Sequence, residues 1–305
     1  MWLQQVAQLA VAGVVNGSFY ALLGVGFGII LGVTGRFHYA FALVFTLAAF
    51  VTSTLESAAG WPAALAAAAG LVVAALLGVA IERFIYRPLA LFSGPLSLLT
   101  VFISSLGVTI AGVNLITLIW SAESRTLTLV PLISLQAGDV TFTSLDLFLV
   151  ATTWALIAAL ALLLRATDLG RAIRAARGNP ALARIMGTDP GRIYLVVFAI
   201  GSVLCGTAGI LNGARFAVLP DMGDRPVVFA FVVAFLGGTH RSPFVIGIAG
   251  LFIGLVESLS GYWVTPQWTS LVVFTVLFAY LILHPLDLRA LRTLVAAARL
   301  STRRA

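Results

Sequence analysis

Six arginines in the segment 165–192 are the polar side chains whose number and spacing most suggest a function. They face only two carboxylates in this segment, and the set is Arg165, Arg171, Arg174, Arg177, Arg184 and Arg192, with Asp168 and Asp189. Such a cluster could bind anionic lipid and set the topology of the chain. It could also dock a cytoplasmic partner. Because the chain has no evident energy source of its own, we favour docking to a motor subunit.

Helix-capping residues predict that these arginines lie on two short helices. Thr167 or Asp168 can cap a first helix, with the acidic residue in its first turn and arginines toward its end. Gly178 ends this helix, and Asn179 caps a second one that has Pro180 at its first position. Turn residues then close the unit: Gly187, Asp189, Pro190 and Gly191.

Several kinds of covalent chemistry are excluded by composition. All 18 basic residues are arginine, so the chain has neither the lysine of a P-loop nor one that could form a Schiff base. The single cysteine, Cys205, lies in an apolar run and allows no disulfide framework or thiolate metal cluster. His240 and His284 are too scattered for a metal site. We therefore predict no catalytic residue, no metal site and no cofactor in this chain.

A second set of residues lies in apolar segments, where they could line the path of a solute. This set is Asn16, Ser18, Tyr20, His38, Asn114, Gly237 and Gly238. Asn16 and Ser18 could equally bond neighbouring helices at a glycine-rich contact, and Asn114 is more typical of that structural role. His38 is more typical of an interfacial anchor. Glu257, near the outer end of its helix, could be a gate, an inter-subunit contact or a cap.

The overall composition identifies the class of protein that carries these residues. The chain has 305 residues, 61% apolar and 10% charged, whereas a soluble domain is about half apolar and a quarter charged. A soluble enzyme, a nucleic-acid binder and a disordered protein are excluded. We predict an all-α polytopic membrane protein, with residues 1–305 forming one transmembrane domain.

Apolar runs of roughly 20 residues, the length that spans a bilayer, predict eight or nine membrane-spanning helices. The count depends on the short segment 227–238. The predicted spans are 6–31, 37–54, 62–81, 95–119, 147–164, 193–214, 227–238, 244–260 and 267–284.

The distribution of arginine predicts the orientation. The loop 165–192, the stretch 82–87 and the tail 285–305 are basic, whereas the loops 120–146 and 215–226 carry both signs of charge. Since cytoplasmic loops are enriched in arginine and lysine, the first three are predicted to be cytoplasmic, the C-terminus included. The last two are predicted to be external.

The external loop 120–146 also predicts a small strand pair at the outer mouth. The stretches TLTLV and VTFTSL are alternating or rich in strand-forming residues, and they flank Gly138-Asp139.

Six motifs, in order and spread over nearly the whole chain, resemble the permease subunit of branched-chain amino acid ABC importers. They are Asn16-Gly17-Ser18-Phe19-Tyr20-Ala21-Leu22; Glu82-Arg83 with Arg87-Pro88-Leu89; Ile103 to Asn114 with Gly107; Thr167-Asp168-Leu169-Gly170-Arg171-Ala172 with Arg174-Ala175; Asn179-Pro180; and Gly237-Gly238 with Glu257.

The resemblance implies that the segment 167–190 couples the chain to a separate ATPase subunit. The residues that would contact the ATPase subunit or set the shape of this segment are Arg171, Arg174, Arg177, Asn179, Pro180, Arg184, Gly187 and Asp189. Two permease chains, more often related than identical, would enclose the path, and two cytoplasmic ATPase subunits would bind ATP and Mg²⁺. A periplasmic or extracellular binding protein would deliver the solute to the external loops.

The resemblance further implies a place in the bacterial cytoplasmic membrane and import of branched-chain or related amino acids by alternating access. Two segments depart from the family's pattern: His38-Tyr39-Ala40-Phe41-Ala42 replaces the usual Asn-Phe-Ala-His-Gly, and Phe229-Ala230-Phe231 replaces Lys-Ala-Phe. A more aromatic path would suit a more apolar solute. The alternative is a stand-alone secondary carrier or channel, which we disfavour because the spans carry almost none of the buried charge that proton-driven transport needs.

Overall fold

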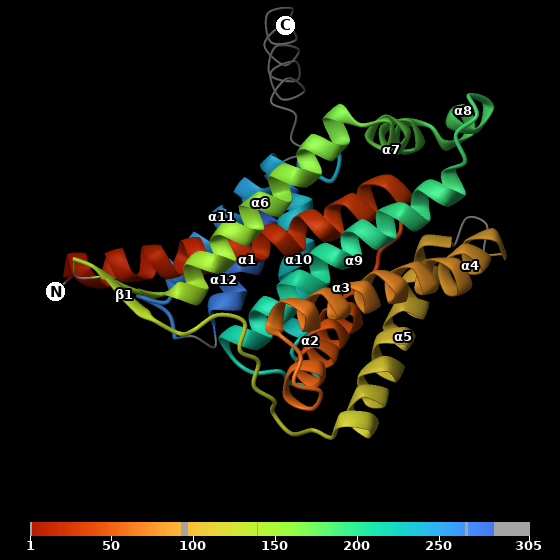
Figure 1. Cartoon of the computed structure of the whole chain (residues 1–305). Coiled ribbons are helices and arrows are strands. Elements are labelled where there is room, and N and C mark those ends of the chain that lie inside the picture. Colours follow the sequence, from red (N-terminus) through yellow and green to blue (C-terminus); the bar gives the residue numbers. More distant parts are fainter. Residues whose placement is uncertain (1, 93–96, 139, 266–267, 284–305) are drawn as a thin grey trace, which may run out of the picture.

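A computed structural model describes residues 2–92, 97–138, 140–265 and 268–283, and these residues are predominantly helical (Figure 1). The helices are α1 (Trp2–Thr34), α2 (Phe41–Ser57), α3 (Ala63–Ala80), the π-helix η1 (Ile81–Tyr86), α4 (Arg87–Phe92), α5 (Ser97–Trp120), α6 (Ser144–Ala166), α7 (Asp168–Gly178), α8 (Pro180–Ile185), α9 (Pro190–Arg215), α10 (Asp224–Gly237), α11 (Pro243–Ser260) and α12 (Thr269–Leu283). The strands are β1 (Ser134–Ala137) and β2 (Val140–Thr143). Asp139 and the predicted basic tail 285–305 lie outside the described residues.

Each of the nine apolar segments predicted as a span overlaps a helix, although the span predicted at 37–54 begins in the loop before α2. Helices are expected there because lipid offers no hydrogen-bond partner to the backbone. In the described part of the chain, six helices are long and apolar enough to cross a membrane, and α2 and α12 are shorter apolar helices. The predicted all-α, multi-pass architecture is confirmed. With 14 residues, α10 is only about 21 Å long at 1.5 Å per residue, shorter than a hydrocarbon core.

The long helix α1 lies in the middle of the bundle and packs against α6, α9, α10 and α11 (Figure 1). Its closest partner is α11, where a Cβ added to Gly254 would overlap the backbone of Gly17. Small residues at such crossings allow helices to approach closely in lipid. The glycine of the first motif therefore serves this helix contact.

The helices end at two opposite ends of the molecule, which differ in the loops they carry (Figure 1). We call the end with β1, β2 and the loop 216–223 the hairpin end. The end with α4, α7 and α8 is the arginine-rich end. The start of α1 belongs to the hairpin end, because the Gln8 amide donates to the Thr141 carbonyl at 2.8 Å and accepts from its N–H at 3.0 Å.

The predicted strand pair is present, but one of its strands is misplaced. β2 lies within VTFTSL as predicted, and it pairs antiparallel with β1. Gly138, with φ of +63°, stands at the turn between them. The stretch TLTLV, residues 126–130, forms no strand, so that part of the prediction is wrong.

Backbone partners elsewhere explain why residues 126–130 do not join the hairpin. Arg125, just before them, exchanges two backbone hydrogen bonds with Val218 at 2.9 and 3.1 Å. The N–H of Thr128 donates to the Glu56 carboxylate at 3.2 Å. The side chain of Leu127 is buried. This stretch therefore ties the loop 216–223 to α2 instead of extending the sheet.

Candidate functional site

A cavity of about 250 Å³ opens at the hairpin end, between α1, α6, α9, α10 and α11. We call it the hairpin-end cavity, and it is lined by Asn16, Phe19, Tyr20, Leu149, Asn212, Arg215, Phe216, Arg225, Pro226 and Glu257. Its wall therefore combines two guanidinium groups, one carboxylate and two amides with four apolar or aromatic side chains and the Tyr20 ring. A few convergent polar groups in a largely apolar cavity are typical of a small-molecule site.

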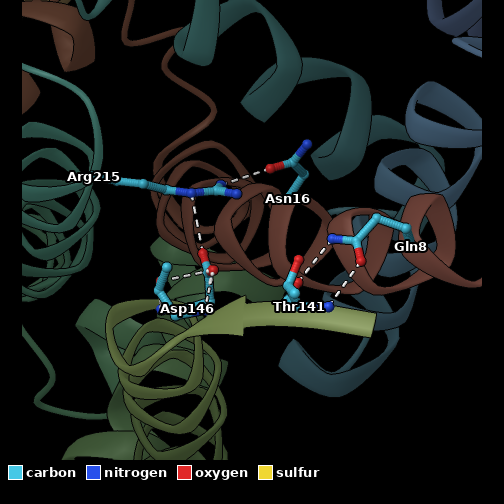
Figure 2. A network of polar contacts seen from close by, with 6 residues as sticks. Gln8, Asn16, Thr141, Asp146 and Arg215 are labelled. Atoms are coloured by element: carbon cyan, nitrogen blue, oxygen red, sulfur yellow. Dashed lines mark hydrogen bonds and ion pairs between the residues drawn. The ribbon is translucent and has the colours of Figure 1, made fainter. Parts of the chain in front are cut away.

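Arg215 forms the first charged group of this cavity. Its Nη1 donates to Asn16 Oδ1 at 2.7 Å, and its Nε lies 3.2 Å from Asp146 Oδ1 (Figure 2). Asp146 is itself fixed by a capping box with Thr143 at the start of α6. Contacts from α1 and α6 thus hold the guanidinium of α9 in one place.

Arg225 and Glu257 form the second charged group. Arg225 Nη2 lies 3.3 Å from Glu257 Oε1 and donates to Ser270 Oγ at 3.2 Å. Glu257 is buried and also interacts with Tyr20, whose ring stacks on Phe229 with centroids 4.6 Å apart. This group therefore joins α10, α11, α12 and α1 on one side of the cavity.

The lining of the cavity carries charge of both signs. Arg215, Arg225 and Glu257 belong to the lining, whereas Asp146, which pairs with Arg215, does not. Two guanidinium groups and one carboxylate offer a partner both to the carboxylate and to the ammonium group of a zwitterion. Apolar surface lies beside them, from Phe19, Leu149, Phe216 and Pro226.

Of the residues predicted to line a path, the structure brings Asn16 and Tyr20 together in this cavity. Ser18 is buried and accepts a hydrogen bond from Trp154 Nε1 at 3.2 Å, between α1 and α6. Asn114 is exposed on α5 and donates to the Ile110 carbonyl of its own helix at 2.8 Å.

The other predicted path residues lie at the arginine-rich end. His38 is fully buried in the loop 35–40, with its Nδ1 2.8 Å from the Tyr86 hydroxyl, and burial lowers its pKa to about 3. Gly237 packs against Ile246 at the start of α11, and Gly238 has φ of +78°. They are not brought together with Asn16 and Tyr20.

Sequence reasoning missed the arginines that form the cavity. From the sequence alone, Arg215 and Arg225 count only among the charges of the loop 215–226. The available signal is their position, because they lie at one end of the helices in a chain whose described arginines gather mostly at the other end. Such residues usually have a partner at hand.

The predicted helix pair is present at the arginine-rich end as α7 and α8. Thr167 Oγ1 accepts from the Gly170 N–H at 3.0 Å and caps α7. Asn179 Oδ1 accepts from two N–H groups of α8, at 3.0 and 3.1 Å, with Pro180 at its first position. Gly187 has φ of +85°, and Asp189 caps α9. The predicted caps are formed and Gly187 lies in a turn, but Pro190 and Gly191, predicted as part of the closing turn, are the first residues of α9.

The outer surface of α8 is apolar although it lies in a loop between spans. Leu182, Ile185 and Met186 are 58%, 79% and 84% exposed. Arg184 beside them is exposed too, as are Arg171 and Arg174 on α7. Exposed apolar side chains with a charged rim are typical of a protein–protein contact.

Arg177 differs from the other arginines of α7 because its donors are used within the chain. Its Nη2 donates to the Thr239 carbonyl at 2.6 Å, and its Nε donates to His240 Nδ1 at 3.1 Å. Burial lowers its pKa. It therefore ties α7 to the loop between α10 and α11.

A buried ion pair closes the arginine-rich end of the bundle. Arg36, in the loop 35–40, pairs with Glu82 of η1, and its guanidinium lies 5.5 Å from the ring centre of Tyr194. Glu82, of the second motif, is 1% exposed. The motif residue thus anchors the π-helix to the first loop of the chain.

Comparison with known proteins follows this geometry. A family model described as the permease component of branched-chain amino acid transport systems matches residues 9–281. The chain is 28% identical over 289 residues to the high-affinity branched-chain amino acid transport system permease protein LivH of Escherichia coli K12, covering 90% of this chain and 92% of LivH. It is 28% identical over 292 residues to the corresponding protein BraD of Pseudomonas aeruginosa, covering 91% and 94%. No solved structure matches the chain.

Proposed function

We propose that this chain, which belongs to the family of branched-chain amino acid transport system permease components, is the membrane-spanning subunit of an importer. Separate ATPase subunits drive this importer. The observation that carries this proposal is the exposed apolar surface of α8 on a helix pair fixed by three caps. A rigid element with an apolar contact surface can transmit a movement from one subunit to another.

In this proposal α8 inserts into the ATPase subunit and moves with it. Ile185 and Met186 supply the apolar contact, and Arg171, Arg174 and Arg184 surround it with positive charge. ATP closes the two ATPase subunits, and α7 carries the movement into α6 and α9, which it contacts. A second permease chain completes the path, which then opens alternately to one side of the membrane and to the other. A binding protein delivers solute at the hairpin end. This orients the arginine-rich end to the cytoplasm, in accord with the positive-inside rule.

We assign small amino acids with apolar side chains as the solute. LivH and BraD are branched-chain amino acid permeases by name, and the hairpin-end cavity provides charged groups of both signs beside apolar walls. The carboxylate of the solute would lie toward Arg215 and its ammonium toward Glu257. An amino acid ester or amide, which lacks the anionic group, should then compete poorly with leucine for uptake.

Docking to an ATPase subunit is tested by co-purification and ATP-dependent uptake. The change Ile185→Glu with Met186→Glu should lower co-purification of the ATPase by more than about tenfold, because a charge in an apolar contact costs more than about 1.4 kcal/mol. A matched control is Leu132→Glu with Ile133→Glu, which are exposed apolar residues at the hairpin end. The control should keep the ATPase. Uptake by the purified chain alone, independent of ATP, would overturn the proposal.

A further inference from the structure

A second pocket, of about 210 Å³, lies at the arginine-rich end beneath α7. We call it the arginine-end pocket. Its lining is Ile29, Val33, Ala161, Leu164, Arg165, Ile173, Arg174, Arg177, His240, Arg241, Ser242 and Pro243. These residues come from α1, α6, α7, the loop 238–242 and the start of α11.

The lining is divided between apolar and basic side chains. Its apolar part comes mainly from the ends of α1 and α6, which are membrane-spanning candidates. Four arginines and one histidine make up most of the polar part, and the lining contains no carboxylate. Such a pocket carries uncompensated positive charge, which an anion would offset.

The polar part is held in place by contacts within the chain. Arg177 donates to the Thr239 carbonyl and to His240 Nδ1, at 2.6 and 3.1 Å, which fixes the loop 238–242 against α7. Because His240 Nδ1 accepts this bond, the ring proton of the neutral imidazole lies on Nε2 and remains a donor. Ser242 caps α11, so the positive end of an 18-residue helix adjoins the same space.

The position of the pocket selects the kind of anion. It lies where α1 and α6 end and α11 begins, at the level where a hydrocarbon core gives way to headgroups. A soluble anion would gain nothing from the apolar walls, whereas a lipid offers a phosphate and an adjoining apolar part. Basic pockets between spanning helices on the cytoplasmic side suit anionic lipid headgroups.

We propose that the arginine-end pocket binds the phosphate group of an anionic phospholipid from the inner leaflet. Arg165, Arg174 and Arg241 bind the phosphate, and the apolar residues of α1 and α6 contact the glycerol and the first carbons of the acyl chains. The bound lipid joins α7 to α6 and α11. The site shares only Arg174 with the proposed ATPase contact, and α8 with its apolar surface is not part of its lining. Lipid binding therefore does not require a docked ATPase.

Native mass spectrometry of the full chain in detergent, with added dioleoyl phosphatidylglycerol, tests the site. The variant Arg165→Gln with Arg241→Gln removes two charges from the pocket and spares Arg177, whose hydrogen bonds hold the loop. We expect about tenfold less bound lipid. The matched control Arg171→Gln with Arg184→Gln removes two exposed charges outside the lining and should change binding by less than about twofold. The variant Arg165→Lys with Arg241→Lys should retain most of it, since lysine also binds phosphate.

Three results would overturn the proposal. Equal binding of dioleoyl phosphatidylcholine would show that negative charge is not selected. An equal loss in the control and pocket variants would show binding by overall surface charge. Displacement of the lipid by 10-fold excess inorganic phosphate, roughly as well as by excess phosphatidylglycerol, would assign the site to a free anion, because a lipid should gain from the apolar walls. Matching thermal unfolding curves for all variants show that each is folded.

Discussion

The hairpin end and the arginine-rich end differ most in how their charges are balanced. Among the described residues, three arginines and six carboxylates belong to the hairpin end, whereas ten arginines and three carboxylates belong to the arginine-rich end. At the hairpin end, Arg215 and Arg225 each pair with a partly or fully buried carboxylate. At the other end, the described ion pairs of α7 and α9 are exposed, and only Arg36 has a buried partner.

The difference separates two uses of arginine. Paired arginines at the hairpin end hold helices together around a cavity, so removing an arginine leaves a largely buried carboxylate without its counter-charge. Arginines at the other end mostly face solvent or the arginine-end pocket, so removing one costs little stability and takes away a contact for an anion. Variants at the two ends should therefore have opposite profiles of stability and binding.

The buried pair Arg36–Glu82 is the exception at the arginine-rich end and should give the largest effect. Glu82→Gln leaves the Arg36 guanidinium buried without a counter-charge, which should lower the free energy of unfolding by about 3–5 kcal/mol. Denaturant titration in mixed micelles measures the change. The double variant Arg36→Met with Glu82→Met should regain most of it, because no charge is then left unpaired. If the double variant is as unstable as Glu82→Gln, the loss of stability comes from packing and not from the unpaired charge.

Asp146→Ala should give the next largest effect, at the hairpin end. It removes the ion pair with Arg215 and the capping box with Thr143, and the two losses together should cost about 2–3 kcal/mol. The matched control is Asp168→Ala, which also removes an aspartate from the first turn of a helix. Asp168 is 88% exposed, and among the described residues its ion-pair partner is the exposed Arg171. The control should lose less than about 1 kcal/mol, and equal losses would contradict the distinction between the two ends.

His38 predicts a dependence of stability on pH that arises at the arginine-rich end. Its pKa is lowered by burial to about 3 in the folded chain, against about 6.5 when unfolded. The neutral ring therefore contributes stability that is present above pH 6.5 and is lost as pH falls toward 3. Between pH 7 and 5 the loss should be about 2 kcal/mol. The variant His38→Phe should no longer lose this stability, as measured by denaturant titrations at each pH. If its free energy of unfolding falls with pH as steeply as in the original chain, other groups cause the loss.

The sequence predicts the parts of this fold that depend on residues close to one another along the chain. Apolar runs predict the helices of the nine spans to within a few residues, and Thr167, Asn179 and Pro180 predict the caps of α7 and α8. The prediction of a basic loop at 82–87 is wrong, because these residues lie in η1 and at the start of α4. The strand prediction for residues 126–130 is wrong because partners distant in sequence bind the backbone here: Thr128 donates to Glu56, and Arg125, just before the stretch, pairs with Val218. Local pattern carries no information about such partners.

The candidate cavity depends on contacts that no local pattern contains. Asn16 and Arg215 are 199 positions apart, and Arg225 and Glu257 meet across two helices. Only the packing of five helices brings these side chains around one space. The motif that contains Asn16 and Tyr20 pointed toward the cavity, but its two arginines could be found only from the structure.

Arg184 should give the smallest change in stability and is the strictest test of the difference between the ends. It is exposed on α8, so Arg184→Glu should alter the free energy of unfolding by less than about 0.5 kcal/mol. If α8 docks an ATPase, the reversed charge beside Ile185 should still lower co-purification by about tenfold. Arg192→Glu, a reversal at another exposed arginine at the start of α9, should leave co-purification unchanged. Equal effects of the two reversals would mean that α8 has no special contact, and that the arginine-rich end acts only through its total charge.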